Sequence, residues 1–303
     1  MDINTLRSNR NTSFSKIAEQ FNQEANPQAT QSYVDNRFWK PERDKAGNAT
    51  ATIRFLNTIE GDELPWVKVF SHGFKGPTGR WYIENSLTTI GQADPVSELN
   101  MKLWNSTTDD KSPARKQARD QKRKLNYISN ILVVNDPKHP ENNGKVFLFK
   151  YGKKIFDKLM DKARPTFEDE QPVNVFDYWE GANFKLRARK VDGYVNYDSS
   201  EFESPAPIAK TDEGILEVVK QQYALNEFVS EKNFKSYAEL KKKLDMVLSG
   251  EPVTETAASI SVREEEPVLR APQPASKAAP APKSLDDDDE DMLSYFKSIA
   301  EED

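Results

Sequence analysis

Hydrophobic and polar residues alternate in short runs through the middle of the chain, and this alternation predicts β-strands. Pro and Gly separate the runs, for example at Asp136-Pro137 and Asn143-Gly144, which is typical of turns in a meandering antiparallel sheet. We expect strands at residues 50–56, 66–70, 80–83, 128–134, 145–151 and 183–191.

Two other segments carry apolar residues at helical spacing. The first, residues 151–163, stops before Pro165 and has one apolar face, made of Ile155, Phe156, Leu159 and Met160. The second ends at Gly250 and has a stripe that we interpret as a packing surface: Phe234, Tyr237, Leu240, Leu244 and Leu248. The pattern predicts an α+β protein with a small antiparallel β-barrel core and added helices.

Composition divides the chain further. Of the 303 residues, 36% are hydrophobic and 30% are charged, so we expect part of the chain to stay unfolded. We predict an N-terminal arm (1–24), a core (25–250), a disordered linker rich in Pro and Ala (251–283) and an acidic tail (284–303). Apolar residues recur at helical spacing in the arm, which we expect to fray unless it docks.

The tail dominates the charge of the molecule. Its twenty residues hold nine acidic residues and one lysine, a net charge of -8, whereas the whole chain carries -6. The residues upstream therefore sum to about +2, so the tail can compete with phosphates for a basic core. Apolar residues at helical spacing also predict that the tail binds partner proteins, with its candidate contacts being Asp286, Asp287, Asp288, Asp289, Glu290, Asp291, Tyr295 and Phe296.

Enzyme chemistry finds little support. The chain has no cysteine and two histidines, His72 and His139, and neither lies in a nucleophile motif. The sequences Gly144-Lys145-Val146 and Gly152-Lys153-Lys154 lack the spacing and the Ser/Thr of a phosphate-binding loop. No signal peptide or long apolar stretch is visible, so we expect a soluble protein without a membrane partner.

Basic residues are placed in a way that suits nucleic acid. Along the last predicted strand, alternation sends Lys185, Arg187 and Arg189 to one face. Same-face neighbours lie about 6.6 Å apart at ~3.3 Å per residue, close to the ~6 to 7 Å phosphate repeat of an extended single strand. We call this row of Lys185, Arg187 and Arg189 the ladder. The alternative interpretation is that it is an ordinary outer face of the sheet, exposed to solvent and without a ligand.

Two further clusters favour the binding interpretation. Residues 102–124 contain eight Lys or Arg against three Asp, and residues 145–154 interleave lysines with aromatic rings. Aromatic faces stack on any base while cations hold the backbone. Besides the ladder, the candidate phosphate contacts are Lys122, Arg123, Lys124, Lys150, Lys153 and Lys154, and the candidate stacking residues are Tyr127, Phe149, Tyr151, Tyr194 and Tyr197.

Several short sequence motifs, taken in order along the chain, resemble those of one phage protein family. They are Trp39-Lys40, Asp44-Lys45-Ala46-Gly47-Asn48, Ile53-Arg54-Phe55-Leu56, His72-Gly73-Phe74-Lys75, Trp81-Tyr82-Ile83-Glu84, Asn130-Ile131-Leu132-Val133-Val134, Gly152-Lys153-Lys154-Ile155 and Trp179-Glu180-Gly181-Ala182-Asn183-Phe184. Over residues of about 35–250 the chain looks like the T-even gene 32 single-stranded DNA-binding protein family.

The resemblance implies an OB-fold core and cooperative coating of single-stranded DNA in phage replication, recombination and repair. It also implies a site of action in the cytoplasm of the infected bacterium and a tail that recruits replication and recombination proteins. The family also self-associates through its arm, and the basic residues Arg7 and Arg10 partly match the basic motif that it uses there.

One departure concerns metal. The family implies a structural zinc held by one His and three Cys, of which His72 matches the histidine, while Ser86, Asp94 and Ser97 stand at the cysteine positions. Thiolates make such a site tight, so we expect no metal and no other cofactor. Two alternatives for the function remain. One is an RNA-binding protein, because no residue pattern indicates whether the ligand carries the 2′-hydroxyl of RNA. The other is a replication scaffold with incidental DNA binding.

Overall fold

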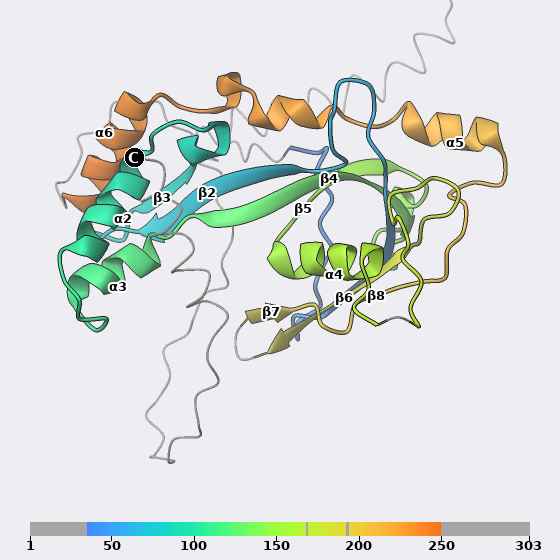
Figure 1. Ribbon diagram of the computed structural model, residues 1–303, viewed down its shortest axis with the longest axis horizontal. Coiled ribbons are helices and arrows are strands. Elements are labelled where there is room, and N and C mark those ends of the chain that lie inside the picture. The colour runs from blue at the N-terminus through green and yellow to red at the C-terminus, as the bar shows by residue number, and fades with distance from the viewer. Residues whose placement is uncertain (1–34, 168, 192–193, 250–303) are drawn as a thin grey trace, which may run out of the picture. The chain divides into compact units, whose positions relative to one another are not determined.

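The sheet is organised around one long strand, β4 (Lys124–Asn135), in a computed structural model that describes residues 35–167, 169–191 and 194–249 (Figure 1). Along one edge, the first half of β4 pairs with β2 (Val67–Lys75) and the second half with β1 (Ala49–Phe55). Along the other edge it pairs with β5 (Val146–Tyr151). All three pairings are antiparallel, as the turn-rich sequence predicts.

Four more strands complete the sheet. They are β3 (Trp81–Asn85), β6 (Phe184–Val191), β7 (Tyr194–Asn196) and β8 (Glu201–Phe202). The order is β3-β2-β4-β1-β6-β7, with β8 paired to β6. The sheet curls into a half-barrel, which confirms the predicted α+β class with an OB-like core.

Helices are added around this sheet. The described residues contain α2 (Pro95–Asn105), α3 (Pro113–Asp120), α4 (Lys153–Ala163), α5 (Asp212–Val219) and α6 (Tyr237–Leu248), with 3-10 turns η1 (Leu87–Ile90), η2 (Pro140–Asn142), η3 (Leu225–Val229) and η4 (Glu231–Asn233). Figure 1 shows α2, α3 and α6 gathered around the end of the sheet where β2 and β3 run. None of the described helices is long and apolar enough to cross a membrane.

The predicted helices and strands are confirmed with shifted ends. On the predicted apolar face of α4, Ile155, Phe156 and Leu159 are buried, whereas Met160 is 47% exposed. The sequence analysis also missed α2, α3 and α5, of which α3 and α5 span only eight residues each. Their start signals were present, since the side chains of Asp94, Ser112 and Thr211 cap them.

Four apolar clusters hold the described parts together, and two of them position the sheet and its helices. The larger one fills the inside of the half-barrel and joins residues of β1, β4, β5, β6 and α4, with Phe55, Tyr151 and Phe184 at its centre. A smaller one packs α2 and α6 against β2 and β3 through residues such as Phe74, Tyr82 and Leu244. The predicted boundaries of arm, core, linker and tail lie outside the described residues.

A buried arginine fixes the loops around β6. Arg54 in β1 is fully buried, and its Nη2 donates hydrogen bonds to the carbonyl oxygens of Asp177 (2.8 Å) and Ala206 (2.9 Å). Gly181 lies against the same group, and a Cβ built there would lie 2.4 Å from the carbonyl oxygen of Asp177 and 2.7 Å from Arg54 Nη2. The loop before β6 therefore requires glycine at this position.

We expect Gly181→Ala to lower the free energy of unfolding by about 2 to 3 kcal/mol, because the added methyl group overpacks a site whose neighbours are backbone and a buried guanidinium. Urea denaturation would measure the change. Gly73→Ala in β2 is the matched control, because a Cβ there meets no described atom within 4 Å. Equal stabilities for the two variants would contradict the close packing around Arg54.

Candidate nucleic-acid interface

The ladder on β6 is arranged as the alternation predicted. Phe184, Leu186 and Ala188 are buried in the main cluster, while Arg187 and Arg189 are exposed and Lys185 is half-buried on the opposite face. The backbone of β6 pairs with β1 over residues 184–188 and with β7 at Arg189, which fixes the direction of each side chain. The strand therefore presents three cations in a row on the outer face of the half-barrel.

Two of these cations have acidic partners within the molecule. Lys185 Nζ lies 3.1 Å from Glu203 Oε1, and Arg187 Nη2 lies 3.1 Å from Glu201 Oε1. Both acids come from the segment that forms and follows β8, which pairs with β6. The charge of the ladder is therefore partly balanced when no nucleic acid is bound.

The third cation belongs to a group around Asp198. The pKa of this carboxyl is lowered by a hydrogen bond from Asn196 and, against the effect of burial, by three nearby cations, which are Lys154, Lys158 and Arg189. Lys158 Nζ also donates to the Asp198 carbonyl oxygen at 3.0 Å. The structure thus brings Lys154 of α4 and Arg189 of β6 to the same place, although they are far apart in sequence.

The two tyrosines near this group differ in exposure. Tyr194 is 81% exposed in β7, whose neighbour strand is β6, so its ring is available to a base. Tyr197 is partly buried and packs against the main cluster. Of the five predicted stacking residues, Tyr194 therefore fits the role best.

Three predicted stacking residues are in the core instead. Tyr127, Phe149 and Tyr151 are each no more than 5% exposed. Tyr127 stacks on Phe156 with a ring-centroid distance of 3.9 Å, and the Tyr151 hydroxyl bonds to Ser129 Oγ at 2.9 Å. The prediction that these rings stack on bases is wrong for this structure, because the half-barrel needs them to fill its interior.

The lysines predicted around α4 do not all share one surface. Lys150 of β5 pairs with Ile128 of β4, on the side of the sheet away from Phe149 and Tyr151. Lys153 lies on α4, which packs on the inner side, and it forms an ion pair with Asp157 at 3.0 Å. Lys150 is therefore separated by the sheet from the cations of α4.

The remaining basic cluster lies at the start of β4. Lys122 and Arg123 lie between α3 and β4, and Lys124 is the first residue of β4 and pairs with Ser71. The guanidinium of Arg123 lies over the ring of Phe70, 4.2 Å from its centroid.

Sequence reasoning missed this type of pair. Two more occur in the same part of the chain, Lys75 over Trp81 at 4.8 Å and Arg115 over Trp104 at 4.4 Å, and both rings are partly exposed. A cation beside a partly exposed ring combines the two groups that hold single strands. Lys75 and Trp81 are cross-strand partners of β2 and β3, so the turn around Gly79 between them was the available signal for that pair.

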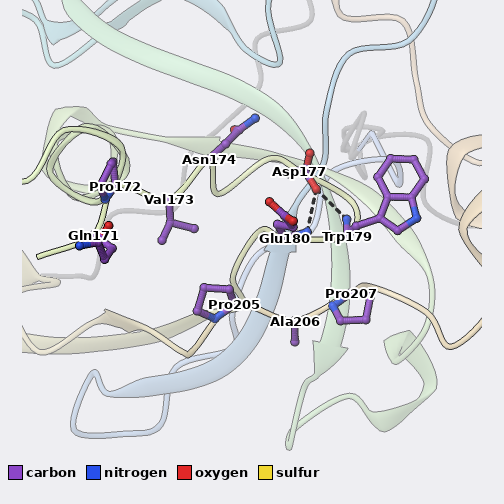
Figure 2. Close-up of a pocket in the computed structure, with 10 residues that line it drawn as sticks. All are labelled: Gln171, Pro172, Val173, Asn174, Asp177, Trp179, Glu180, Pro205, Ala206 and Pro207. Carbon is purple, nitrogen blue, oxygen red and sulfur yellow. Dashed lines mark hydrogen bonds between the residues drawn. The ribbon is translucent and has the colours of Figure 1, made fainter.

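A shallow pocket of about 420 Å³ lies on another part of the half-barrel (Figure 2). Its charged lining residues are Asp177 and Glu180, and Trp179 beside them is 54% exposed. The Asp177 carboxylate accepts hydrogen bonds from the backbone N–H groups of Trp179 (2.8 Å) and Glu180 (2.7 Å), as the dashed lines in Figure 2 show. An acidic lining does not suit a phosphate.

The positions compared with the family's zinc site hold a polar network. His72 is buried, with Nδ1 2.9 Å from the Gln121 carbonyl oxygen and Nε2 3.2 Å from Asp94 Oδ1. The Asp94 carboxylate also accepts backbone N–H bonds from Leu87, Val96 and Ser97. Burial raises the pKa of Asp94, but His72 and these N–H groups lower it more, to about 2.

These residues do not fit a tetrahedral zinc. Both oxygens of Asp94 are already engaged, and the Ser86 hydroxyl bonds to Thr88 Oγ1 at 3.0 Å. Serine hydroxyls are much weaker zinc ligands than thiolates. Among the described residues no group of three or more His, Cys, Asp or Glu side chains could hold a metal.

A curled antiparallel sheet with an outward row of cations is the kind of surface that proteins binding single-stranded polyanions present. Comparison with known proteins agrees with this class. A family model described as gp32 DNA binding protein like matches residues 47–248. The chain belongs to this gp32-like DNA-binding family.

Two relatives cover most of the chain. The single-stranded DNA-binding protein of Enterobacteria phage T2 is 41% identical over 219 residues, which are 71% of this chain and 70% of the relative. The single-stranded DNA-binding protein of Enterobacteria phage T4 is 39% identical over 239 residues, 77% of each chain. The predicted arm residues Arg7 and Arg10 and the tail residues from Asp286 to Phe296 lie outside the described part of the structure.

We propose that the His72 and Asp94 network holds this part of the protein without metal, and we expect a chelator to leave the melting temperature unchanged. Asp94→Ala should lower the free energy of unfolding by about 2 to 4 kcal/mol, by the same amount with and without chelator, because it removes a helix cap and a buried charge partner. One tightly held zinc per chain in elemental analysis would refute the proposal.

Proposed function

We propose that the protein is a non-enzymatic single-stranded DNA-binding protein that coats DNA during phage replication, recombination and repair. The observation that carries the proposal is the outward row of Lys185, Arg187 and Arg189 in a chain of the gp32-like DNA-binding family. The names of the T2 and T4 relatives support the same polymer. Its site of action would be the cytoplasm of the infected bacterium.

The first proposed contact combines positions from three elements. Lys154 of α4 joins the β6 ladder near Asp198, and Tyr194 of β7 offers an exposed ring. The Arg123 and Phe70 pair marks a second contact at the start of β4. Cations that meet phosphates and rings that meet bases give affinity with little sequence preference.

An RNA-binding protein is the second candidate, because the same cations would bind RNA phosphates. Competition between oligo(dT) and oligo(U) of equal length would separate the two polymers. A replication scaffold with incidental DNA binding is the third candidate. Full-length protein that captures replication proteins but shows no saturable binding of oligo(dT) would favour the scaffold.

We expect oligo(dT) to bind far more tightly than duplex DNA, with log K falling against log salt with a slope of roughly -3 to -4 if about four to six phosphates are contacted. Arg187→Ala should weaken binding by about three- to tenfold for all sequences and make the slope shallower by ~0.7. Tryptophan or tyrosine fluorescence titration would measure both.

Lys220→Ala is the matched control for Arg187→Ala, because Lys220 is an exposed cation outside the proposed contacts. Equal affinity for duplex and single strands, or equal losses in the two variants, would argue against the β6 surface.

We also propose that the arm (1–24) gives cooperativity by docking on a neighbouring copy, and that the acidic tail (284–303) recruits replication and recombination proteins and competes with DNA. Removing the arm should spare binding to an oligonucleotide that fits one molecule and weaken binding to long strands. Removing the tail should strengthen DNA binding at low salt and abolish partner capture.

Affinity on short and long oligonucleotides, measured for both truncated proteins beside the full chain, would test the two roles. Unchanged coating of long strands without the arm would reject cooperativity through it. If the protein without the tail binds DNA with unchanged affinity and still captures the same partner proteins, the tail serves only solubility.

A further inference from the structure

The acids that face the ladder are held there by the fold. Ser200 is buried beside Arg187, and its hydroxyl accepts a hydrogen bond from Arg187 N (2.8 Å) and donates one to Arg187 O (3.1 Å). Arg187 Nη1 also donates to the carbonyl oxygen of Ser199 at 3.3 Å. The segment that carries Glu201 is thus attached to the ladder strand by its own backbone and by one serine.

Glu203 is fixed from the other side. Its backbone N donates to Asn183 O at 2.8 Å, and its Oε2 accepts from Asn183 Nδ2 at 3.0 Å while Oε1 faces Lys185. Hydrogen bonds from Asn183 and Lys185 lower the pKa of Glu203, so the group is a carboxylate at neutral pH. Both oxygens therefore have partners before any ligand arrives.

A carboxylate in this position offers a cation the same kind of acceptor as a DNA phosphate. The two pairs are partly exposed, with side-chain exposures of 42% for Lys185 and 46% for Arg187. Ion pairs of this exposure are weak, because water screens them. A strand that supplies successive phosphates can therefore replace the carboxylates without unfolding β8.

We propose that Glu201 and Glu203 are internal competitors of DNA phosphate on the β6 ladder, and that they set the affinity of the protein for single strands. This inference rests on the proposed function, because it assigns the ladder to DNA. The protein then exchanges two carboxylates for phosphates when it binds.

The test uses the full chain with Glu201→Gln, Glu203→Gln and the double variant, titrated with oligo(dT) at low salt. Each substitution keeps the shape of the side chain and removes its charge. We expect about threefold tighter binding for each single variant and about tenfold for the double variant, an effect that shrinks as salt rises. Thermal unfolding of each variant reports whether the fold is retained.

Glu213→Gln with Glu217→Gln is the matched control. Both residues are exposed on α5, and the pair removes the same two negative charges from the molecule. If the control tightens binding as much as the double variant on β8, net charge is the cause and the proposal is wrong.

A double-mutant cycle tests the exchange itself. Glu201→Gln should tighten binding in the intact protein but have no effect when Arg187→Ala is present, because the carboxylate would then have no ladder cation to release. Equal tightening in both backgrounds would overturn the proposal.

The cycle also separates this inference from the function on which it rests. Weakening by Arg187→Ala without tightening by Glu201→Gln rejects the competitor role and leaves the DNA-binding ladder standing. If neither substitution changes the affinity, the ladder is not the DNA contact, and both the proposed DNA-binding role of the ladder and the competitor role of the glutamates are wrong.

Discussion

The buried guanidinium of Arg54 is the interaction on which the arrangement of the binding surface depends. It comes from β1 and binds the carbonyl oxygens of Asp177 and Ala206, with Asn183 Oδ1 at 3.4 Å. One of these segments leads into β6 and the other follows β8. The same side chain therefore determines where the cations of β6 and the acids beside them lie relative to the rest of the half-barrel.

Burying this charge has a cost that the surroundings offset. Burial lowers the pKa of Arg54 to about 10, although the charge of Asp177 acts in the opposite direction, so the group stays protonated at neutral pH. Removing one partner of a buried charge costs more than the pair itself contributes, because the remaining charge is left without compensation. The close approach of Gly181 is part of this arrangement, since any side chain there would separate the loop from the guanidinium.

Cations gather on the outer face of β6 although the chain is acidic overall. Net charge is -6, yet the outer face of β6 carries three cations and α4 adds Lys154 nearby. Two acids, Glu201 on β8 and Glu203 just after it, lie beside the ladder, and two others, Asp177 and Glu180, line the pocket near Trp179. A polyanion therefore meets a local positive surface, and the neighbouring carboxylates decide how strongly that surface holds it.

The sequence by itself determined the strands that alternate, the two helices with clear apolar stripes and the outward direction of Lys185, Arg187 and Arg189. These are local properties, because side-chain direction in a strand repeats every two residues. The tertiary structure decided which aromatic rings are exposed to solvent. Tyr127 and Tyr194 both stand beside charged or turn residues, but the closing of the half-barrel buries the first and leaves the second exposed. The tertiary structure also placed Glu201 and Glu203 opposite the ladder and buried Arg54. These contacts depend on strand pairing and loop packing between residues that are distant in sequence, so no local sequence pattern predicts them.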